Sequence, residues 1–341
     1  MRHVNKMRGL GAARQHARGF SLIELMVALV LGLVIVGGVV SLFVNNQQAA
    51  RTNEGLGRLQ ENARTAFELL AREIRQVGGN PCGAVTTTNA LINPAANWWS
   101  NWDGGVLRGF DETQDTLGMA PFGAGVGQRV AGTHALIVLS GGMFNGSIIT
   151  NHTPANQTIT LNSTGHGLVA NDLAVVCDGE SAALVQLTAV TTTPAGTVRH
   201  QVGGTSLNST VDIGFPAGTP KTFQPNGLVT RYTASFWYVG NNPRGGRSLY
   251  RMGRNGVGEE IADGVSNMQV GYLTRNQGNG NLANDWVTAS AVTDWTNAAT
   301  NLPVAVRLTL TLSSADGVGV GQVPLQRQVF HVINLRNRPA P

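Results

Sequence analysis

The feature that most constrains this chain is an uncharged apolar run close to its N-terminus. Residues Leu25 to Val44 read LMVALVLGLVIVGGVVSLFV, twenty residues without a charged side chain. In a helix that rises about 1.5 Å per residue, this run spans about 30 Å, which is the hydrocarbon thickness of a bilayer. The sequence therefore predicts one helix that crosses a membrane.

The charges that precede the run predict its orientation. The first nineteen residues contain five basic side chains and no acidic one: Arg2, Lys6, Arg8, Arg14 and Arg18. Because positive flanks stay in the cytoplasm, we expect a cytoplasmic N-terminus and an exported C-terminal part. An ordinary secretory signal has a shorter apolar core and a small-residue cleavage site, and no such site follows Val44.

The same basic tail accounts for the net charge of the whole chain. Removing its five charges from the 24 basic residues leaves 19, against 19 acidic residues. The rest of the chain is formally neutral, whereas a nucleic-acid-binding surface needs clustered Lys and Arg. The sequence therefore argues against nucleic-acid binding by the exported part.

One carboxylate, Glu24, stands at the start of the apolar run. A charged side chain within a membrane span costs about 2.5–3.5 kcal/mol at the bilayer centre and less near the edge. The positive end of the helix dipole stabilises an acidic side chain in the first turn, which is one explanation for Glu24. The other explanation is a functional charge that pairs with a cation of a partner.

Residues 19–43, GFSLIELMVALVLGLVIVGGVVSLF, resemble the class III signal of type IV prepilins and pseudopilins. The resemblance implies that a prepilin peptidase cuts after Gly19 and that the new N-terminal residue, Phe20, is N-methylated. It also implies that Glu24 pairs with the N-terminal amine of a neighbouring subunit. Such a pair is little screened in an apolar filament core.

Beyond the membrane the pattern remains helical and then changes to strands. Apolar residues recur at spacings of three and four, which predicts a helix with one buried stripe: Leu56, Leu59, Ala63, Phe67, Leu70, Ile74 and Val77. Gly78 and Gly79, with Pro81 beyond them, are expected to end this helix. We expect the stripe to pack on the sheet of the exported part.

From Cys82 onward the sequence predicts strands joined by Gly-rich turns, with a hairpin around 240–246. The expected strands are 134–140, 157–161, 173–177, 183–190, 228–239, 247–252, 265–273, 303–313 and 323–335. The predicted class is α+β, a long hydrophobic helix on an antiparallel, β-rich head of the pilin-like kind. Its expected parts are a basic leader (1–19), a transmembrane helix (20–44), an amphipathic periplasmic helix (45–78) and the head (79–341).

Two cysteines, Cys82 and Cys177, lie in the part that we expect to be exported, where disulfides persist. A bridge between them would close a loop of about 95 residues and stabilise the fold by about 4–5 kcal/mol in the chain-entropy model. Two buried free thiols are the alternative. No His spacing near either cysteine matches a zinc site.

The sequence shows no catalytic motif, and we expect neither an enzyme nor a bound cofactor or metal. It contains no H-E-x-x-H and no G-x-S-x-G pattern. The acidic residues Asp103, Asp111, Glu112 and Asp115 match no calcium-loop spacing, so a solvated loop is expected there. The segments 97–103, which is rich in Trp, and 279–300 are expected to be surface insertions.

The later part of the chain resembles minor pilins of the PilW type. The resemblance rests on several segments in order: 70–78 with Cys82, 176–187, 248–251, 261–272, and the ending 327–338. It implies a subunit of the bacterial inner membrane, with a periplasmic head, that primes or caps type IV pilus assembly and then lies near the pilus tip. The implied partners are the prepilin peptidase, other minor pilins, the major pilin and the inner-membrane assembly platform.

Two other functions remain open from the sequence. A minor pseudopilin of a type II secretion system would share the N-terminal helix and the same assembly logic. Alternatively, a pilin-anchored adhesive head could use Trp98, Trp99 and Trp102 as an aromatic binding platform, because exposed aromatic clusters often mark binding sites.

Overall fold

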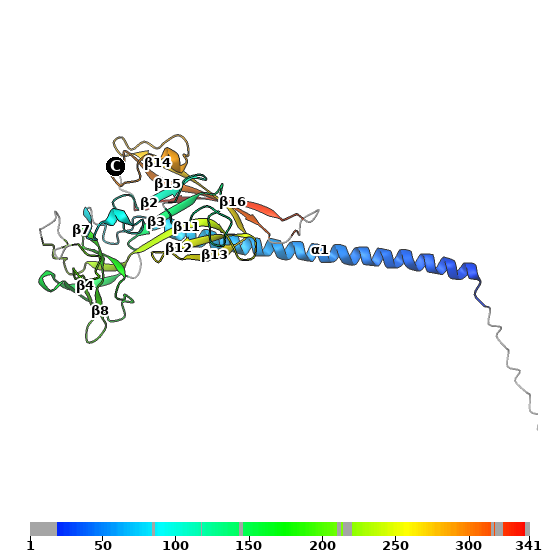
Figure 1. Ribbon diagram of the computed structural model, residues 1–341, viewed down its shortest axis with the longest axis horizontal. Coiled ribbons are helices and arrows are strands. Elements are labelled where there is room, and N and C mark those ends of the chain that lie inside the picture. The colour runs from blue at the N-terminus through cyan, green and yellow to red at the C-terminus, as the bar shows by residue number, and fades with distance from the viewer. Residues whose placement is uncertain are drawn as a thin grey trace, which may run out of the picture. The chain divides into compact units, whose positions relative to one another are not determined.

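The computed structural model describes residues 19–83, 86–116, 118–142, 146–209, 213, 220–314, 317 and 323–337 (Figure 1). The predicted leader therefore lies outside the described residues except for Gly19. The chain divides into two compact units, Met1–Glu54 and Gly55–Pro341. One helix, α1 (Leu22–Arg75), contributes its first part to one unit and its last turns to the other.

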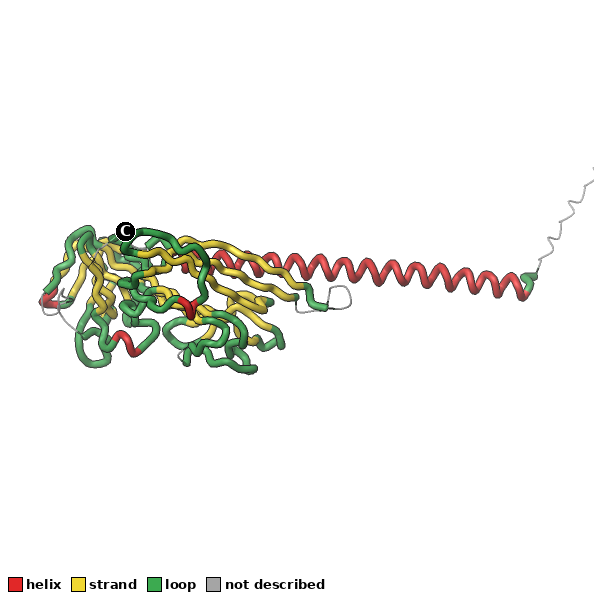
Figure 2. The backbone as a smooth tube through the Cα atoms, turned by 90° about the horizontal axis from the view of Figure 1, so that it is seen from above, coloured by secondary structure: helices red, strands yellow, loops and turns green. Residues whose placement is uncertain are grey.

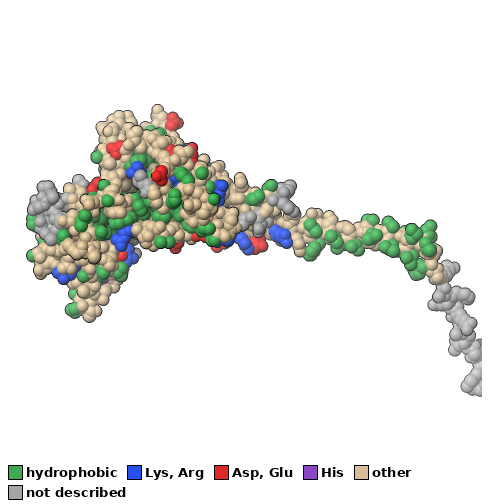
Figure 3. Space-filling view, viewed as in Figure 1, with side chains coloured by type: hydrophobic (Ala, Val, Ile, Leu, Met, Phe, Trp, Pro, Cys, Tyr) green, Lys and Arg blue, Asp and Glu red, His purple; other side chains and the backbone are tan. Residues whose placement is uncertain are grey.

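In the first unit, α1 exposes apolar side chains on every side. Its most apolar window is long enough to cross a membrane, and none of that window is buried (Figure 3). A helix that is apolar all round is stable only inside a protein core or in lipid. The exposed helix is consistent with membrane anchoring.

In the second unit, α1 buries one face against the strands, which lie beside its last turns in Figure 2. The predicted stripe is confirmed from Leu59 onward, whereas Leu56 is only half-buried. The buried residues of this face are Leu59, Ala63, Ala66, Phe67, Leu70, Ala71 and Ile74, and buried Val77 follows just after the helix. Fully burying one large apolar side chain stabilises the fold by about 1.5–3 kcal/mol, so this face fixes the helix on the sheets.

Two polar contacts of Glu73 also fix the orientation of α1 against the sheets. Glu73 on α1 accepts a hydrogen bond from the indole Nε1–H of Trp237 at 2.7 Å. The other carboxylate oxygen of Glu73 pairs with Arg251 at 3.2 Å. Trp237 is fully buried, so its N–H would be unsatisfied without Glu73.

The helix ends at Arg75, and the chain turns through Gly78 as predicted. Gly78 has φ +65°, a left-handed conformation that favours glycine after a helix. Its N–H donates to the carbonyl of Leu139 at 2.9 Å. A side chain at this position would meet Val106 Cγ2 at 3.1 Å, so glycine also permits the close approach of the turn to the head.

The strands of the second unit form three sheets, and most of their pairings are antiparallel. The first has eight strands in the order β1-β7-β6-β10-β4-β5-β9-β8, the second has five in the order β13-β12-β11-β3-β2, and the third has three in the order β14-β15-β16. The parallel pair is β1 with β7. This arrangement confirms the predicted α+β class with a sheet-rich head.

The bounds of the strands follow their order in the chain. They are β1 Thr86–Asn89, β2 Leu107–Phe110, β3 Ala135–Ser140, β4 Ser147–Thr153, β5 Thr158–Leu161, β6 Leu173–Cys177, β7 Ser181–Gln186, β8 Ala189–Thr191, β9 Thr197–Arg199, β10 Leu228–Arg231, β11 Thr233–Asn241, β12 Arg247–Met252, β13 Gly258–Asp263, β14 Val265–Asn276, β15 Asn301–Ser313 and β16 Gln326–Asn334. Three short 3₁₀ helices, η1 Pro94–Ala96, η2 Pro154–Asn156 and η3 Ala289–Ala291, lie between strands.

The buried apolar residues of this unit form two hydrophobic clusters. The larger cluster joins α1 to the five-stranded and three-stranded sheets and also includes residues of β6 and β7 from the eight-stranded sheet. The smaller one fills the eight-stranded sheet around Ile149, Ile159 and Val229. In Figure 1 the strands β4, β7 and β8 gather apart from β11–β13 and β14–β16.

Nine strand predictions meet strands in the structure, and the hairpin between β11 and β12 is confirmed. Two predictions each span two strands: 183–190 covers most of β7 and the start of β8, and 228–239 covers β10 and most of β11. β10 pairs with β6 and β4 in the eight-stranded sheet, whereas β11 pairs with β3 and β12 in the five-stranded sheet. The chain changes sheets at Tyr232, where its N–H donates to the carbonyl of Leu173 at 2.8 Å.

The two expected surface insertions pack against the head, so this expectation is wrong for their central residues. Trp102 is 6% exposed and lies 5.5 Å from Tyr232 between ring centroids. In the segment 279–300, Trp295 packs edge-on against Tyr272 at 4.9 Å. Buried Ala289, Val292 and Ala299 anchor this segment along β14.

Candidate processing and assembly site

The expected cleavage site lies just before α1. Gly19, Phe20 and Ser21 belong to no helix or strand, and the side chain of Phe20 is 86% exposed. Apart from its chain neighbours, no heavy atom of the described residues lies within 4 Å of the position that a Cβ on Gly19 would take. A peptidase can bind an exposed segment outside helices and strands without first unfolding it.

Ser21 and Glu24 form a reciprocal capping box at the start of α1. The Ser21 N–H donates to Glu24 Oε2 at 3.0 Å, and the Glu24 N–H donates to Ser21 Oγ at 3.2 Å. The Leu25 N–H donates to the Ser21 carbonyl at 3.2 Å and begins the helical ladder. Two N–H groups that would otherwise lack partners at the helix start are thus satisfied.

The capping box holds the Glu24 carboxylate on the N–H of Ser21, the residue that follows Phe20. Cleavage after Gly19 would turn the Phe20 nitrogen into a free amine beside the residue that already binds this carboxylate. The Glu24 side chain is exposed and remains accessible to a second molecule. The sequence prediction singled out Glu24 but missed Ser21, although the spacing S-x-x-E before an apolar run signals such a cap.

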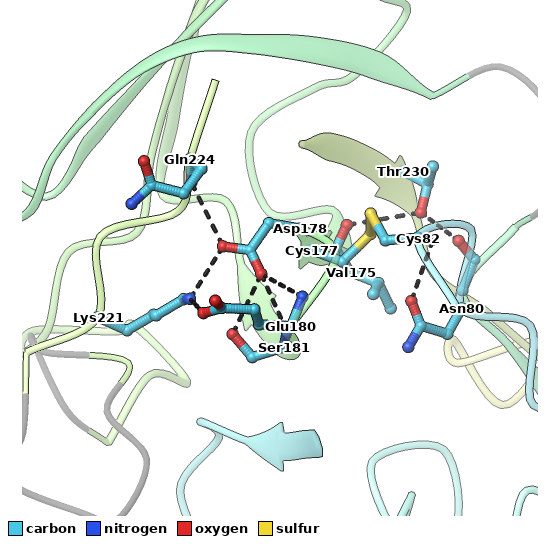
Figure 4. The surroundings of a disulfide bond; sticks show 11 residues. Asn80, Cys82, Val175, Cys177, Asp178, Glu180, Ser181, Lys221, Gln224 and Thr230 are labelled. Carbon is cyan, nitrogen blue, oxygen red and sulfur yellow. Dashed lines mark hydrogen bonds and ion pairs between the residues drawn. A yellow bond between two sulfur atoms is a disulfide. The ribbon is translucent and has the colours of Figure 1, made fainter. Parts of the chain in front are cut away.

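The structure joins Cys82 and Cys177 in the predicted disulfide, with a Cα–Cα distance of 5.8 Å (Figure 4). Cys82 follows the turn that ends α1, and its N–H donates to Asn80 Oδ1 at 3.2 Å. Cys177 is the last residue of β6 and is fully buried. The bridge therefore ties the end of the helix to the eight-stranded sheet.

The residue after the bridge, Asp178, organises the neighbouring loop. Its buried carboxylate pairs with Lys221 at 2.9 Å and accepts N–H groups of Ser181 and Glu180 at 2.9 and 3.0 Å (Figure 4). Burial alone would raise the pKa of Asp178, but Lys221 and these N–H donors together lower it below its usual value. These contacts hold the Asp178 carboxylate in place beside the disulfide and order the loop that follows it.

A second buried carboxylate, Asp111, corrects the expectation of a solvated acidic loop. Asp111 is 7% exposed and accepts the N–H groups of Ala289 and Ser290, both at 2.8 Å. Burial would raise its pKa, and these hydrogen bonds outweigh burial and lower it. Asp111 therefore caps η3, and the described residues contain no group of three side chains suited to hold a metal.

Two histidines far apart in sequence meet in the smaller hydrophobic cluster. His152 on β4 and His200 after β9 lie 3.1 Å apart between their Nε2 atoms, and both are buried. His152 Nδ1 accepts the N–H of Phe223 at 3.0 Å, so the proton of His152 sits on Nε2 and points at His200. Burial lowers the pKa of His152 to about 4, and burial together with the charge of His152 lowers the pKa of His200 to about 4.

This pair predicts a head that loses stability in mild acid. The unfolded-state pKa of histidine is about 6.5, so the unfolded chain binds more protons between pH 6.5 and about 4. Stability should therefore be full above pH 6.5 and should fall through that window, by up to about 1.4 kcal/mol per pH unit for each histidine. Urea unfolding of the full-length protein in detergent, repeated across these pH values, measures the slope.

The matched variant carries His152→Gln and His200→Gln, which keeps hydrogen-bonding groups and removes the titration. It is expected to be less stable at neutral pH but to have a flatter pH dependence in the same window. A slope equal to that of the wild type would show that other groups cause the acid sensitivity.

Comparison with known protein families gives two matches. Residues 14–40 match the family described as prokaryotic N-terminal methylation motif, and residues 236–331 match the family described as type IV pilus-assembly protein W. The first match contains Gly19, Phe20, Ser21 and Glu24, and the second runs from β11 into β16. No curated protein and no solved structure matches the chain. Together, the methylation motif and the later domain make this chain similar to the PilW-type minor pilins of type IV pilus assembly.

Proposed function

We propose that this chain is a minor pilin that primes or caps type IV pilus assembly through packing of α1 and pairing of Glu24. The proposal rests on the arrangement of residues at the start of α1. An exposed carboxylate lies in the first turn of an exposed apolar helix, beside the Gly19–Phe20 bond. Lipid or other subunits can bury the apolar side chains, whereas among the described residues Glu24 has a hydrogen bond from Ser21 but no cationic partner.

The proposed sequence of events begins in the bacterial inner membrane, with the N-terminus in the cytoplasm and the head in the periplasm. The prepilin peptidase cleaves after Gly19, and the Phe20 amine is methylated. Other minor pilins and the major pilin then pack against α1 at the assembly platform. Glu24 exchanges its contact with Ser21 for the cationic amine of a neighbour, and the subunit ends near the pilus tip.

Cleavage is tested by N-terminal sequencing of the mature protein from membranes and from sheared pili. The expected result is a protein that begins with N-methylated Phe20 and lacks residues 1–19. The variant Gly19→Val should accumulate with its leader, since a branched side chain would fill the space that glycine leaves at the cleaved bond. An intact leader on the wild-type protein in functional pili would contradict the proposal.

The assembly role is tested by deleting the gene and counting surface pili. We expect few or no pili, with recovery on complementation, because priming precedes polymerisation of the major pilin. A secretion defect with normal piliation would instead favour a pseudopilin of a type II secretion system, which shares the N-terminal motif. The adhesive alternative loses its structural support, because Trp102 is buried and Trp98 and Trp99 are partly buried against the core.

A further inference from the structure

The three-stranded sheet has one closed edge and one open edge. Along its closed edge, the Tyr272 and Val287 N–H groups donate to each other's carbonyls at 2.8 and 2.9 Å, and the His134 N–H donates to the Met268 carbonyl at 2.9 Å. At the other edge, β16 pairs with β15, and within the described residues no further strand pairs with it. β16 is therefore an unpaired edge nine residues long.

The hydrogen bonds that frame β16 show which of its backbone groups face outward. The Ser314 N–H donates to the Leu325 carbonyl, and the Leu335 N–H donates to the Val304 carbonyl, both at 2.9 Å. In an antiparallel pair of strands, residues that exchange backbone hydrogen bonds with the partner strand alternate with residues that do not. Odd-numbered residues of β16 therefore bond to β15. The N–H and C=O groups of Gln328, Phe330 and Val332 point to the open edge.

Beside this edge, a groove of about 480 Å³ separates β16 from α1. Its apolar lining comes from Ala63, Phe67 and Ala71 on the helix and from Val329 on the strand. His331 also lines it and contacts Phe67 at 4.5 Å between ring centroids. A further strand added to the sheet beside β16 would lie over this groove and cover the adjacent face of α1.

The opposite face of β16 exposes two large apolar side chains between polar ones. Phe330 is 68% exposed and Val332 is 52% exposed. Soluble proteins usually protect an edge strand with charges, prolines or bulges, and a long apolar edge is a template for another strand. An added strand would cover the groove with one set of its side chains and would extend this outer face with the other set.

The charges that line the groove indicate what kind of segment would bind there. Arg64, Arg75 and Arg327 line it together with one carboxylate, Glu68, which pairs with Arg64 at 2.7 Å. Among the described residues, Arg75 and Arg327 form no ion pair. A second copy of this chain would bring the same arginines to the contact, so charge favours a different, acidic segment.

We propose that β16 accepts an extended, acidic segment of another pilus subunit as a fourth strand of its sheet, a mode called β-augmentation. The groove follows α1 from Gln60 to Arg75, about 22 Å of helix, which about seven residues of extended chain match. The segment carries alternate apolar side chains that fill the groove over Phe67. Its carboxylates lie beside Arg75 and Arg327.

The test uses the full-length protein in detergent and a labelled peptide, Glu-Val-Thr-Val-Thr-Val-Glu, with binding followed by fluorescence anisotropy. Two derivatives are N-methylated, one at its three Val amides and the other at its two Thr amides. An added strand bonds to β16 through one edge alone, so one derivative should lose binding and the other should keep it. Replacing both Glu by Lys should weaken binding about tenfold through repulsion by the groove.

The matched protein variants are Phe330→Pro and Phe330→Thr. Proline removes the outward N–H and is tolerated on an edge strand, so it should weaken binding by about tenfold more than threonine, which keeps that N–H. If Phe330→Pro does not fold, the two N-methylated derivatives on the wild-type protein decide the question. Absence of peptide binding, equal binding of both derivatives, or Phe330-dependent self-association of the chain would overturn the proposal.

Discussion

Replacing Glu24 by Ala is expected to leave the protein cleaved and inserted in the membrane but to exclude it from pili. The carboxylate is the one acidic group at the start of an apolar helix, and in a filament core a pair with the Phe20 amine of a neighbour is weakly screened. Loss of one partner leaves the other charge buried and unpaired, which costs about 3–5 kcal/mol. Immunoblots of membranes and of sheared pili measure insertion and incorporation separately.

Two further variants separate the charge of Glu24 from its capping role. Glu24→Gln keeps a side chain that can complete the capping box but removes the charge, so it should fail to incorporate as the Ala variant does. Ser21→Ala removes the hydroxyl that accepts the Glu24 N–H but keeps the carboxylate, so it should incorporate. The reverse pattern would assign Glu24 to helix capping and would reject the pairing mechanism.

Removing the disulfide is expected to lower the free energy of unfolding of the head by about 4–5 kcal/mol, because the bridge closes a long loop in the unfolded chain. The double variant Cys82→Ala and Cys177→Ala is preferable to serine, since Cys177 is fully buried and a serine hydroxyl there would add its own cost. Urea unfolding of the full-length variant and wild type in the same detergent measures the difference.

Reduction of the wild-type protein provides the control for these substitutions. The reduced wild type and the double variant should lose similar stability, because both lack the cross-link and keep the rest of the core. A loss below about 1 kcal/mol in both would show that the unfolded chain is already held together by other contacts near the bridge.

The sequence predicts those parts of the fold whose signal is local. The stripe from Leu59 to Val77 has the helical period, and the alternation in 307–312 places β15 with one face buried, as observed. The short strands β1 and β9 escape prediction because β1 is polar throughout and β9 has a single apolar residue, whereas the equally short β5 alternates Thr with Ile and Leu. The polar strand β4, Ser147–Thr153, escapes because its Asn and His interrupt the alternation.

Features that depend on distant contacts are not visible in the sequence. The sheet change at Tyr232 lies inside a continuous apolar run, so only the pairing partners show it. His152 and His200 meet across 48 residues. The proposed site at the start of α1 is local, so a single motif is enough to predict Gly19, Phe20 and Glu24, whereas the groove beside β16 requires the folded sheet.

The position of the bridge has a mechanical consequence. Cys82 lies shortly after the last turn of α1, and its partner is 95 residues further along the chain. Tension that enters through the helix therefore passes from sulfur to sulfur into β6 and bypasses the intervening polypeptide. The strands β1 to β5 lie off this covalent route, so a pulled helix would not peel them from the head one by one while the cross-link holds.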